Sequence, residues 1–397
     1  MASKLFWQRP QLRTDETENK ERKATWLELF FDLVFVAVVA QLSHSLAADT
    51  TWPGVTKFVL LFVPVWWVWI GSTFYNDRFE TDDVSHRLFA YLQMIAVASL
   101  AFHVHDGLGA SSVGFAISYI AVRVIIIVMW LRGGHHSPEA RPLTNRYAIG
   151  FSISVALWIV SIFIPPPFRF VLWAAGILID IITPLTTLEI QRKMPKLSTS
   201  HLPERFGLFT IIVLGESIVG VVAGASETHH MSVPVAVTGI LGLALSFSMW
   251  WLYFDKVASR RVKPHPWWLA TWVYTHLFLV LSLTGIGSGI LNVVAHDGAI
   301  LSQPALWLIC GSVALSFVTL GLFEFTLAGA YENPKAAKRT AGFRFAGAVL
   351  AMVTGLVLGS ASSIAVISVL AALAIIQIAL ILFEGDSEKE EDMPELA

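Results

Sequence analysis

The sequence predicts an all-α membrane protein: a polytopic transmembrane helical bundle of about 12 helices, built as two parallel six-helix repeats. Of its 397 residues, 55% are hydrophobic and 14% are charged, whereas a soluble domain carries about 25% charged residues. The mean hydropathy is +0.65, the apolar residues form long runs, and the basic residues fall between alternate runs. This composition excludes a soluble enzyme, a nucleic-acid-binding protein and a disulfide-stabilised secreted domain.

Each apolar run is close to the roughly 20 residues that a helix needs to cross a bilayer. None shows the strict alternation of a barrel strand. The first six expected spans lie near residues 27–47, 55–75, 87–104, 111–131, 147–164 and 170–190. The second six lie near residues 206–226, 234–254, 268–291, 303–328, 341–358 and 363–383.

The spans divide the chain into five segments. They are a cytoplasmic N-terminal segment (1–26), a first six-helix half (27–190), a basic cytoplasmic linker (191–205), a second six-helix half (206–383) and an acidic cytoplasmic tail (384–397). The N-terminal segment lacks the apolar region and cleavage site of a signal peptide, so the first span is expected to be retained.

Positive charge collects on one side of the expected bundle. Every Lys and Arg except Lys57, Arg123 and Arg169 falls in the N-terminal segment, in the tail, or in or beside an even-numbered loop. Because basic loops stay on the cytoplasmic side, both termini are expected in the cytoplasm.

The two halves of the chain also echo each other. Glu28 and Glu204 occupy the inner ends of the first and seventh spans. Tyr75-Asn-Asp77-Arg78 ends the second span, and Tyr253-Phe-Asp255-Lys256 ends the eighth. Since each half has an even number of spans, two copies would run parallel, related by an axis along the membrane normal.

Three motifs resemble those of a known family. They are Trp26-Leu-Glu28-Leu-Phe-Phe-Asp32-Leu-Val-Phe-Val, Asn76-Asp-Arg-Phe-Glu-Thr-Asp-Asp83-Val-Ser-His86-Arg87 and Glu204-Arg-Phe-Gly-Leu-Phe-Thr-Ile-Ile-Val-Leu-Gly-Glu216-Ser-Ile. In order and spacing they resemble the bacterial low temperature requirement A (LtrA) family, over most of residues 25–385. The resemblance implies a multi-pass protein of the bacterial cytoplasmic (inner) membrane with a role in growth at low temperature. It implies no particular biochemical activity.

The first motif is also similar to the first-helix motif of potassium-permeable channels built from six-helix units. Those channels have an Arg two residues before the Glu, where this chain has Trp26. Leu208 stands in the second half where Asp32 stands in the first.

Ionisable side chains inside the bilayer are the candidate functional residues, since each costs roughly 2.5–3.5 kcal/mol at a helix centre. Glu28 and Asp32 lie four residues apart, on one helical face. Two such acids repel, so they would hold a cation between them or keep one proton. The alternative is that they pair with Arg78 or Arg87.

Two further acids lie deeper. Glu216 shares a face with Gly220 and Gly224, a pattern of small residues that directs its carboxyl into the bundle; the alternative is an ion pair with Arg123. Asp180 lies four residues before Pro184, which frees the Asp180 carbonyl and creates a possible cation ligand. The alternative there is a packed kink.

Other polar residues are expected to form ion pairs or to have structural roles: Arg123, Asp77, Arg78, His86, Glu204 and His276. No catalytic residue, metal site or cofactor is predicted, because no zinc-protease motif, nucleophile elbow or phosphate-binding glycine loop is present.

The sequence therefore predicts a path through which a small solute or cation crosses the membrane. In one form of this hypothesis, the movement of the solute or cation is coupled to the movement of protons. Glu28, Asp32 and Glu216 would line it, with Asp180 as a further member, and Asp32→Asn and Glu216→Gln are expected to insert normally but lose function. The expected partners are the lipid bilayer and the transported solute or cation, with no nucleic acid. Homo-oligomerisation stays open.

The alternatives are a membrane scaffold or sensor for cold adaptation and a membrane-embedded enzyme; the latter is disfavoured because the loops supply no nucleophile or metal cluster.

Overall fold

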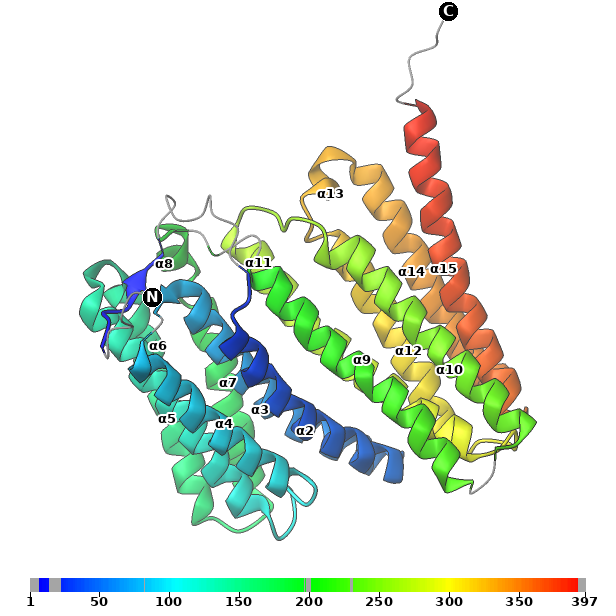
Figure 1. Ribbon diagram of the computed structural model, residues 1–397, viewed down its shortest axis with the longest axis horizontal. Coiled ribbons are helices and arrows are strands. Elements are labelled where there is room, and N and C mark those ends of the chain that lie inside the picture. Colours follow the sequence, from blue (N-terminus) through cyan, green and yellow to red (C-terminus); the bar gives the residue numbers. More distant parts are fainter. Residues whose placement is uncertain are drawn as a thin grey trace, which may run out of the picture. The chain divides into compact units, whose positions relative to one another are not determined.

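The computed structural model describes residues 7–13, 23–81, 83–195, 197, 201–228 and 231–391. Within these residues, twelve helices are long and apolar enough to cross a membrane, which confirms the all-helical class and the number of spans. They are labelled in Figure 1: α2 (Trp26–Ala48), α3 (Trp52–Arg78), α4 (Val84–Val104), α5 (Ser112–His136), α6 (Arg141–Ile162), α7 (Phe168–Leu185), α9 (His201–Glu227), α10 (Val233–Tyr253), α11 (Pro266–Ala295), α12 (Gln303–Glu324), α14 (Pro334–Val357) and α15 (Ser363–Glu391).

Short elements connect these helices: η1 (Pro138–Ala140), α8 (Leu188–Arg192), a π-helical turn η2 (Phe254–Ala258) and α13 (Gly329–Glu332). A small antiparallel ladder was not expected. It joins β1 (Gln11–Leu12) to β2 (Phe79–Glu80), with Gln11 opposite Glu80 and Leu12 opposite Phe79. The ladder attaches the N-terminal segment to the end of α3.

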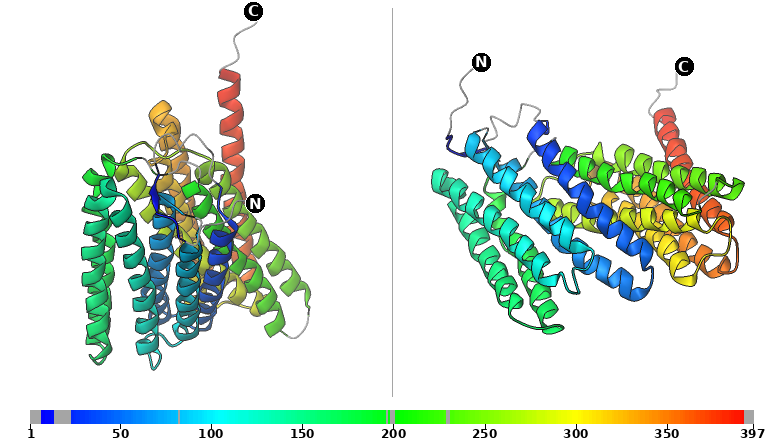
Figure 2. Two further views of the ribbon diagram at one scale, coloured as in Figure 1. Left: turned by 60° about the vertical axis from the view of Figure 1, so that its left-hand side comes forward. Right: turned by 60° about the horizontal axis from the view of Figure 1, so that its bottom comes forward.

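The chain forms two compact units. Unit 1 comprises residues within 1–42, 56–209 and 265–270, and unit 2 comprises residues within 43–55, 210–264 and 271–397. In unit 1, α5 packs between α4 and α6, and α6 packs against α7; in unit 2, α14 packs against α12 and α15, and α10 packs against α15. The two views of Figure 2 show these helices side by side.

Helix α7 has one face that is buried in the protein and one apolar face that is exposed. Trp173, Gly176 and Asp180 are buried, whereas Val171 and Leu178 are exposed on the other face. Exposed apolar faces of this kind suit a hydrocarbon surrounding. The one acid of the helix therefore points into the protein.

Two boundaries differ from the expected segments. Helix α9 begins at His201, inside the predicted linker 191–205, because the side chains of its first turns are buried against other helices. Helix α15 continues to Glu391, into the predicted tail 384–397, where Glu and Lys favour helix. Residues 1–6, 14–22, 196, 198–200 and 392–397 of the predicted terminal and linker segments lie outside the described residues.

Candidate functional site

The first turn of α2 fixes the position of Glu28 through a capping box. The Thr25 N–H donates to Glu28 Oε2 at 2.8 Å, and the Glu28 N–H donates to Thr25 Oγ1 at 3.2 Å. Glu28 is buried. Its carboxylate therefore caps the start of α2 through Oε2, and its other oxygen, Oε1, can contact a neighbouring residue.

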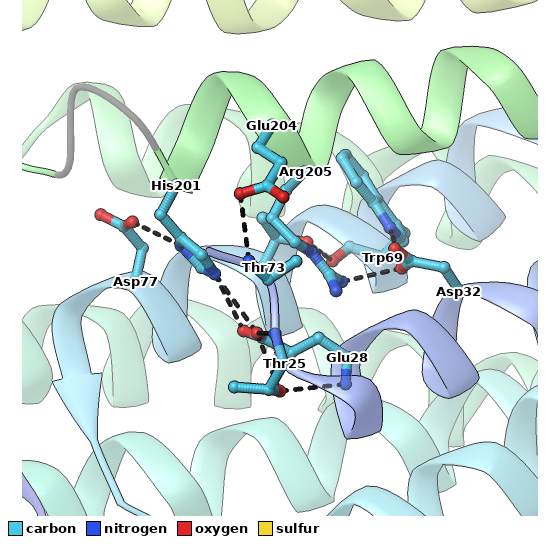
Figure 3. A network of polar contacts seen from close by, with 10 residues as sticks. Thr25, Glu28, Asp32, Trp69, Thr73, Asp77, His201, Glu204 and Arg205 are labelled. Carbon is cyan, nitrogen blue, oxygen red and sulfur yellow. Dashed lines mark hydrogen bonds and ion pairs between the residues drawn. The ribbon is translucent and has the colours of Figure 1, made fainter. Parts of the chain in front are cut away.

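That neighbour is His201, a fully buried residue of the first turn of α9 (Figure 3). Its Nε2 lies 3.1 Å from Glu28 Oε1, and its Nδ1 lies 2.9 Å from Asp77 Oδ1 on α3. A protonated imidazole donates to both carboxylates, whereas a neutral one has a single N–H to donate. The protonation of His201 therefore decides whether it donates one or two of these hydrogen bonds.

One turn further along both helices, a second contact follows the first. Arg205 Nη2 lies 2.7 Å from Asp32 Oδ1, and the Trp69 indole N–H donates to the same oxygen at 2.9 Å. All three side chains are buried. The i, i+4 pair of acids on α2 thus faces an i, i+4 pair of bases on α9, all within unit 1 (Figure 3).

This second contact leaves hydrogen-bonding capacity unused. Asp32 Oδ2 and the Nε and Nη1 of Arg205 are buried and have no hydrogen-bond partner among the described residues. Buried polar groups are normally satisfied, so water or a bound solute is expected at these atoms.

Residues near the two acids, among them one that the sequence offered as their partner, have further contacts. Arg78 Nη1 donates to the Pro195 carbonyl. Glu204, beside Arg205, accepts the Ala24 N–H at 3.0 Å. The contacts that hold Glu28 and Asp32 to another helix thus include His201 and Arg205 of α9.

Sequence reasoning did not single out His201, and it counted Arg205 only as a loop charge. A usable signal was present: the bases at 201 and 205 have the same i, i+4 spacing as the acids at 28 and 32. Matching spacings of opposite charge at the ends of two apolar helices would have linked them.

Glu216 lies in the middle of α9, within unit 2, and is 3% exposed. The Ser43 hydroxyl hydrogen-bonds to its carboxylate. The Ser288 hydroxyl of α11 lies 3.1 Å from the Ser43 hydroxyl and 2.9 Å from the Ser43 carbonyl. Among the described residues, Glu216 forms no ion pair. The Ser43 hydroxyl thus links the Glu216 carboxyl to Ser288.

Helix α9 packs closely against α11 on the face of Gly220 and Gly224, which Glu216 shares. A Cβ placed on Gly220 would lie 2.6 Å from the Gly287 carbonyl oxygen of α11, and one on Gly224 would lie 2.7 Å from the Leu291 carbonyl oxygen. Small residues allow such approach between helices in a membrane.

Asp180 has a full set of partners in unit 1. Arg123 Nη2 lies 2.6 Å from its Oδ1, and the hydroxyls of Tyr119 and Ser154 donate to its Oδ2 at 2.7 and 2.9 Å. The Arg123 guanidinium also lies 4.3 Å from the Phe151 ring centroid. Arg123 thus pairs with Asp180, not with Glu216, and these contacts favour a structural role for both residues.

His276 is likewise engaged within a core. Its Nδ1 lies 2.8 Å from the Trp272 carbonyl, so that nitrogen carries the proton, and its Nε2 accepts from the Tyr253 hydroxyl at 3.0 Å. Among the described residues, no group of three His, Cys, Asp or Glu side chains is arranged to hold a metal ion.

A separate polar cluster anchors the N-terminal segment at Asp83, which precedes α4. Asp83 Oδ1 accepts the His86 N–H at 2.8 Å. Its Oδ2 accepts from the Ser85 hydroxyl, the Gln8 N–H and Arg132 Nη2 at 2.6, 2.8 and 3.1 Å. Burial raises the pKa of Asp83, but these hydrogen bonds and the Arg132 charge outweigh it and lower that pKa to about 2.

The described residues are mainly helical, and their twelve long apolar helices define a polytopic membrane protein. It belongs to the LtrA family: the model of the bacterial low temperature requirement A protein matches residues 23–382. Over 294 residues the chain is 28% identical to a Rhizobium meliloti (strain 1021) protein with the name Uncharacterized protein RA0937, covering 70% of this chain and 71% of that protein.

Proposed function

We propose that this protein transports a small solute or cation across the bacterial cytoplasmic membrane and couples that movement to protons. One observation carries the proposal: the buried carboxyl of Glu216 has the Ser43 hydroxyl as a hydrogen-bond partner and forms no ion pair among the described residues. A bare carboxylate in a membrane interior is costly. Glu216 therefore holds either a proton or a bound cation, and a coupled transporter exchanges these two states.

The network around His201 supports the same proposal. His201 contacts the carboxylates of both Glu28 and Asp77, and Asp32 and Arg205 beside them have unused hydrogen-bonding atoms. A proton arriving at His201 strengthens its contacts to both carboxylates. This network in unit 1 would serve as a proton-binding site. It differs from the site at Glu216 because its acids contact basic side chains.

The orientation is part of the proposal. The N-terminal segment, Arg132, Arg141 and Arg146 lie at or near the ends of α3 and α5 and the starts of α4 and α6. By the positive-inside rule this end faces the cytoplasm, and both termini lie there.

The parallel repeat is also proposed, on the basis of the sequence echoes between the two halves. An experimental structure whose halves 27–190 and 206–383 superpose after rotation about the membrane normal would support it. Halves that superpose only after inversion would contradict it.

The family description adds the expected phenotype, a requirement at low temperature. A scaffold or sensor remains the competing role. Such a role gives no reason for an unpaired buried carboxyl, and loss of flux therefore distinguishes the two: a transporter loses growth in the cold only when it loses transport.

Proteoliposomes with a pH-sensitive dye inside provide the test. Gradients of Na⁺, K⁺ and small organic solutes are imposed in turn, and the movement of protons is recorded. Glu216→Gln is expected to reduce coupled proton movement about tenfold or more, because the amide cannot release a proton. The matched control is Glu227→Gln, an exposed acid at the end of the same helix, which is expected to retain the parental flux.

Two outcomes would overturn the proposal. If folded Glu216→Gln protein moves protons like the parent, the carboxyl is structural. If the parent moves no solute or proton under any gradient while the corresponding deletion strain still fails in the cold, the scaffold or sensor role stands instead.

A further inference from the structure

A groove lies where α5 ends, α6 begins and the N-terminal segment crosses them, all within unit 1. Its volume is about 620 Å³, within the roughly 300–1,000 Å³ of typical ligand pockets. Its polar lining consists of Arg132, His135, His136, Arg141 and Asn145. None of the residues that line it is acidic, so the groove is suited to an anion.

Several hydrogen-bond donors of this lining are unused. Arg141 gives its Nε and Nη2 to the carbonyls of Gly134 and His135, at 3.1 and 3.3 Å, which holds its guanidinium at the groove and leaves Nη1 free among the described residues. The side chains of His135 and Asn145 are exposed and have no hydrogen-bond partner among the described residues. A phosphate oxygen accepts hydrogen bonds from all three.

Arg132 forms the fixed wall of the groove. Its guanidinium lies 3.1 Å from Asp83 Oδ2 and 4.2 Å from the Trp7 ring centroid, and its buried Nε has no partner among the described residues. Asp83 offsets the charge of Arg132, whereas Arg141 has no acidic partner among the described ion pairs. Glu139, on the turn between α5 and α6, is exposed and does not line the groove.

The groove continues into an apolar stripe on α5, made of Leu131, Val128 and Val124. Leu131 and Val128 line the groove and are exposed, and Val124 extends the same face one turn toward the middle of the helix. Spacings of three and four residues place these side chains on one helical face. Basic and aromatic groups beside an exposed apolar stripe match the level at which lipid headgroups meet their acyl chains.

We propose that this groove binds an anionic phospholipid of the inner leaflet. Its phosphodiester lies between Arg141, His135 and Asn145, and one acyl chain follows the apolar stripe of α5. The open apolar side favours a lipid headgroup over free phosphate, which would gain nothing from it. Basic pockets on the cytoplasmic side of membrane helices bind such headgroups by the same charge attraction.

Native mass spectrometry of the purified full chain in detergent tests the proposal. The protein is titrated with phosphatidylglycerol and, separately, with phosphatidylcholine of the same acyl chains. Arg141→Gln is expected to weaken phosphatidylglycerol binding about fivefold, which corresponds to the ~1 kcal/mol that one basic residue contributes near an anionic surface. The matched control is Arg146→Gln, which removes an exposed charge from the same helix outside the groove and is expected to bind like the parent.

His135→Gln provides a second variant, because Arg141 also holds the turn through its carbonyl contacts. It is expected to weaken binding in the same direction. Equal binding by the parent, Arg141→Gln and His135→Gln would overturn the proposal, as would equal affinity for the two lipids. Inorganic phosphate is added as a competitor: displacement of the lipid at millimolar phosphate would assign the site to free phosphate instead.

Discussion

The Asp32 carboxylate and the Arg205 guanidinium form a buried ion pair, 2.7 Å apart, that joins α2 to the first turns of α9. Glu28 and His201 repeat the contact one turn away at 3.1 Å. Two contacts at matching spacing fix both the rotation and the register of these helix ends. A slip of one residue on either helix would break both contacts and leave four polar groups unpaired in the interior.

The ion pair changes what is expected of Asp32→Asn. Removing one partner of a buried pair costs about 3–5 kcal/mol, because the other charge stays buried without compensation. Asp32→Asn is therefore expected to lower the free energy of unfolding strongly, unlike Glu216→Gln, which deprives no described cation of a partner. Thermal unfolding in detergent, followed by circular dichroism, measures the difference.

The double variant Asp32→Asn/Arg205→Gln supplies the control for this pair. Because it removes both charges, it is expected to be more stable than the sum of the two single variants predicts, by about 1 kcal/mol or more. Strict additivity of the three measurements would show that the two side chains do not interact in the folded protein.

His201 is expected to affect stability and flux separately. His201→Gln leaves Glu28 and Asp77 without the imidazole between them, so both stability and coupled proton movement should fall. Adding Glu28→Gln removes one of the two buried charges and should recover part of the stability without recovering the flux. His105→Gln, at an exposed histidine, serves as the control. Recovery of full flux in the double variant would show that His201 is needed for folding alone.

The close approach of α9 and α11 gives a steric prediction. Gly220→Ala places a methyl group 2.6 Å from the Gly287 carbonyl oxygen, so the helices must separate, at a cost of about 1–3 kcal/mol. Gly215→Ala, on the same helix, has no atom within 4 Å of the added methyl and is expected to be neutral or slightly stabilising. The buried thiol of Cys310 reports the opening of unit 2 through its rate of reaction with a maleimide. Equal rates in the two variants would contradict the packing.

The length of the apolar runs was enough to predict the twelve long apolar helices found among the described residues, because a helix needs about 20 apolar residues to cross a bilayer. The partners of the buried groups were not predictable in the same way. Asp180 pairs with Arg123, 57 residues away in sequence, and Glu28 contacts His201, 173 residues away. Such pairs depend on which helices pack together, and periodicity along one helix carries no information about its neighbour.

Asp83 gives a pH-dependent prediction. Its pKa is about 2 in the folded protein and 3.8 as the ordinary value, so it stabilises the fold fully above about pH 4 and loses that effect as the pH falls toward 2. Asp83→Asn is expected to cost about 1–2 kcal/mol at about pH 6 and almost nothing near pH 2. Glu80→Gln, at an exposed acid nearby, is the control. A cost that does not change between about pH 6 and about pH 2 would show that capping geometry, not charge, holds the N-terminal segment.

The last prediction concerns orientation. Single cysteines are introduced at exposed positions in a background without Cys310: Ala110 and Ser360 in two odd-numbered loops, and Glu139 and Lys335 in or beside two even-numbered loops. Because the basic loops are expected in the cytoplasm, an impermeant maleimide added to intact cells should label the first two and spare the others. Permeabilised cells should show labelling at all four positions, which controls for accessibility. Labelling of Glu139→Cys and Lys335→Cys in intact cells would show that the orientation is the opposite one. The groove proposed to bind an anionic phospholipid would then lie in the outer leaflet.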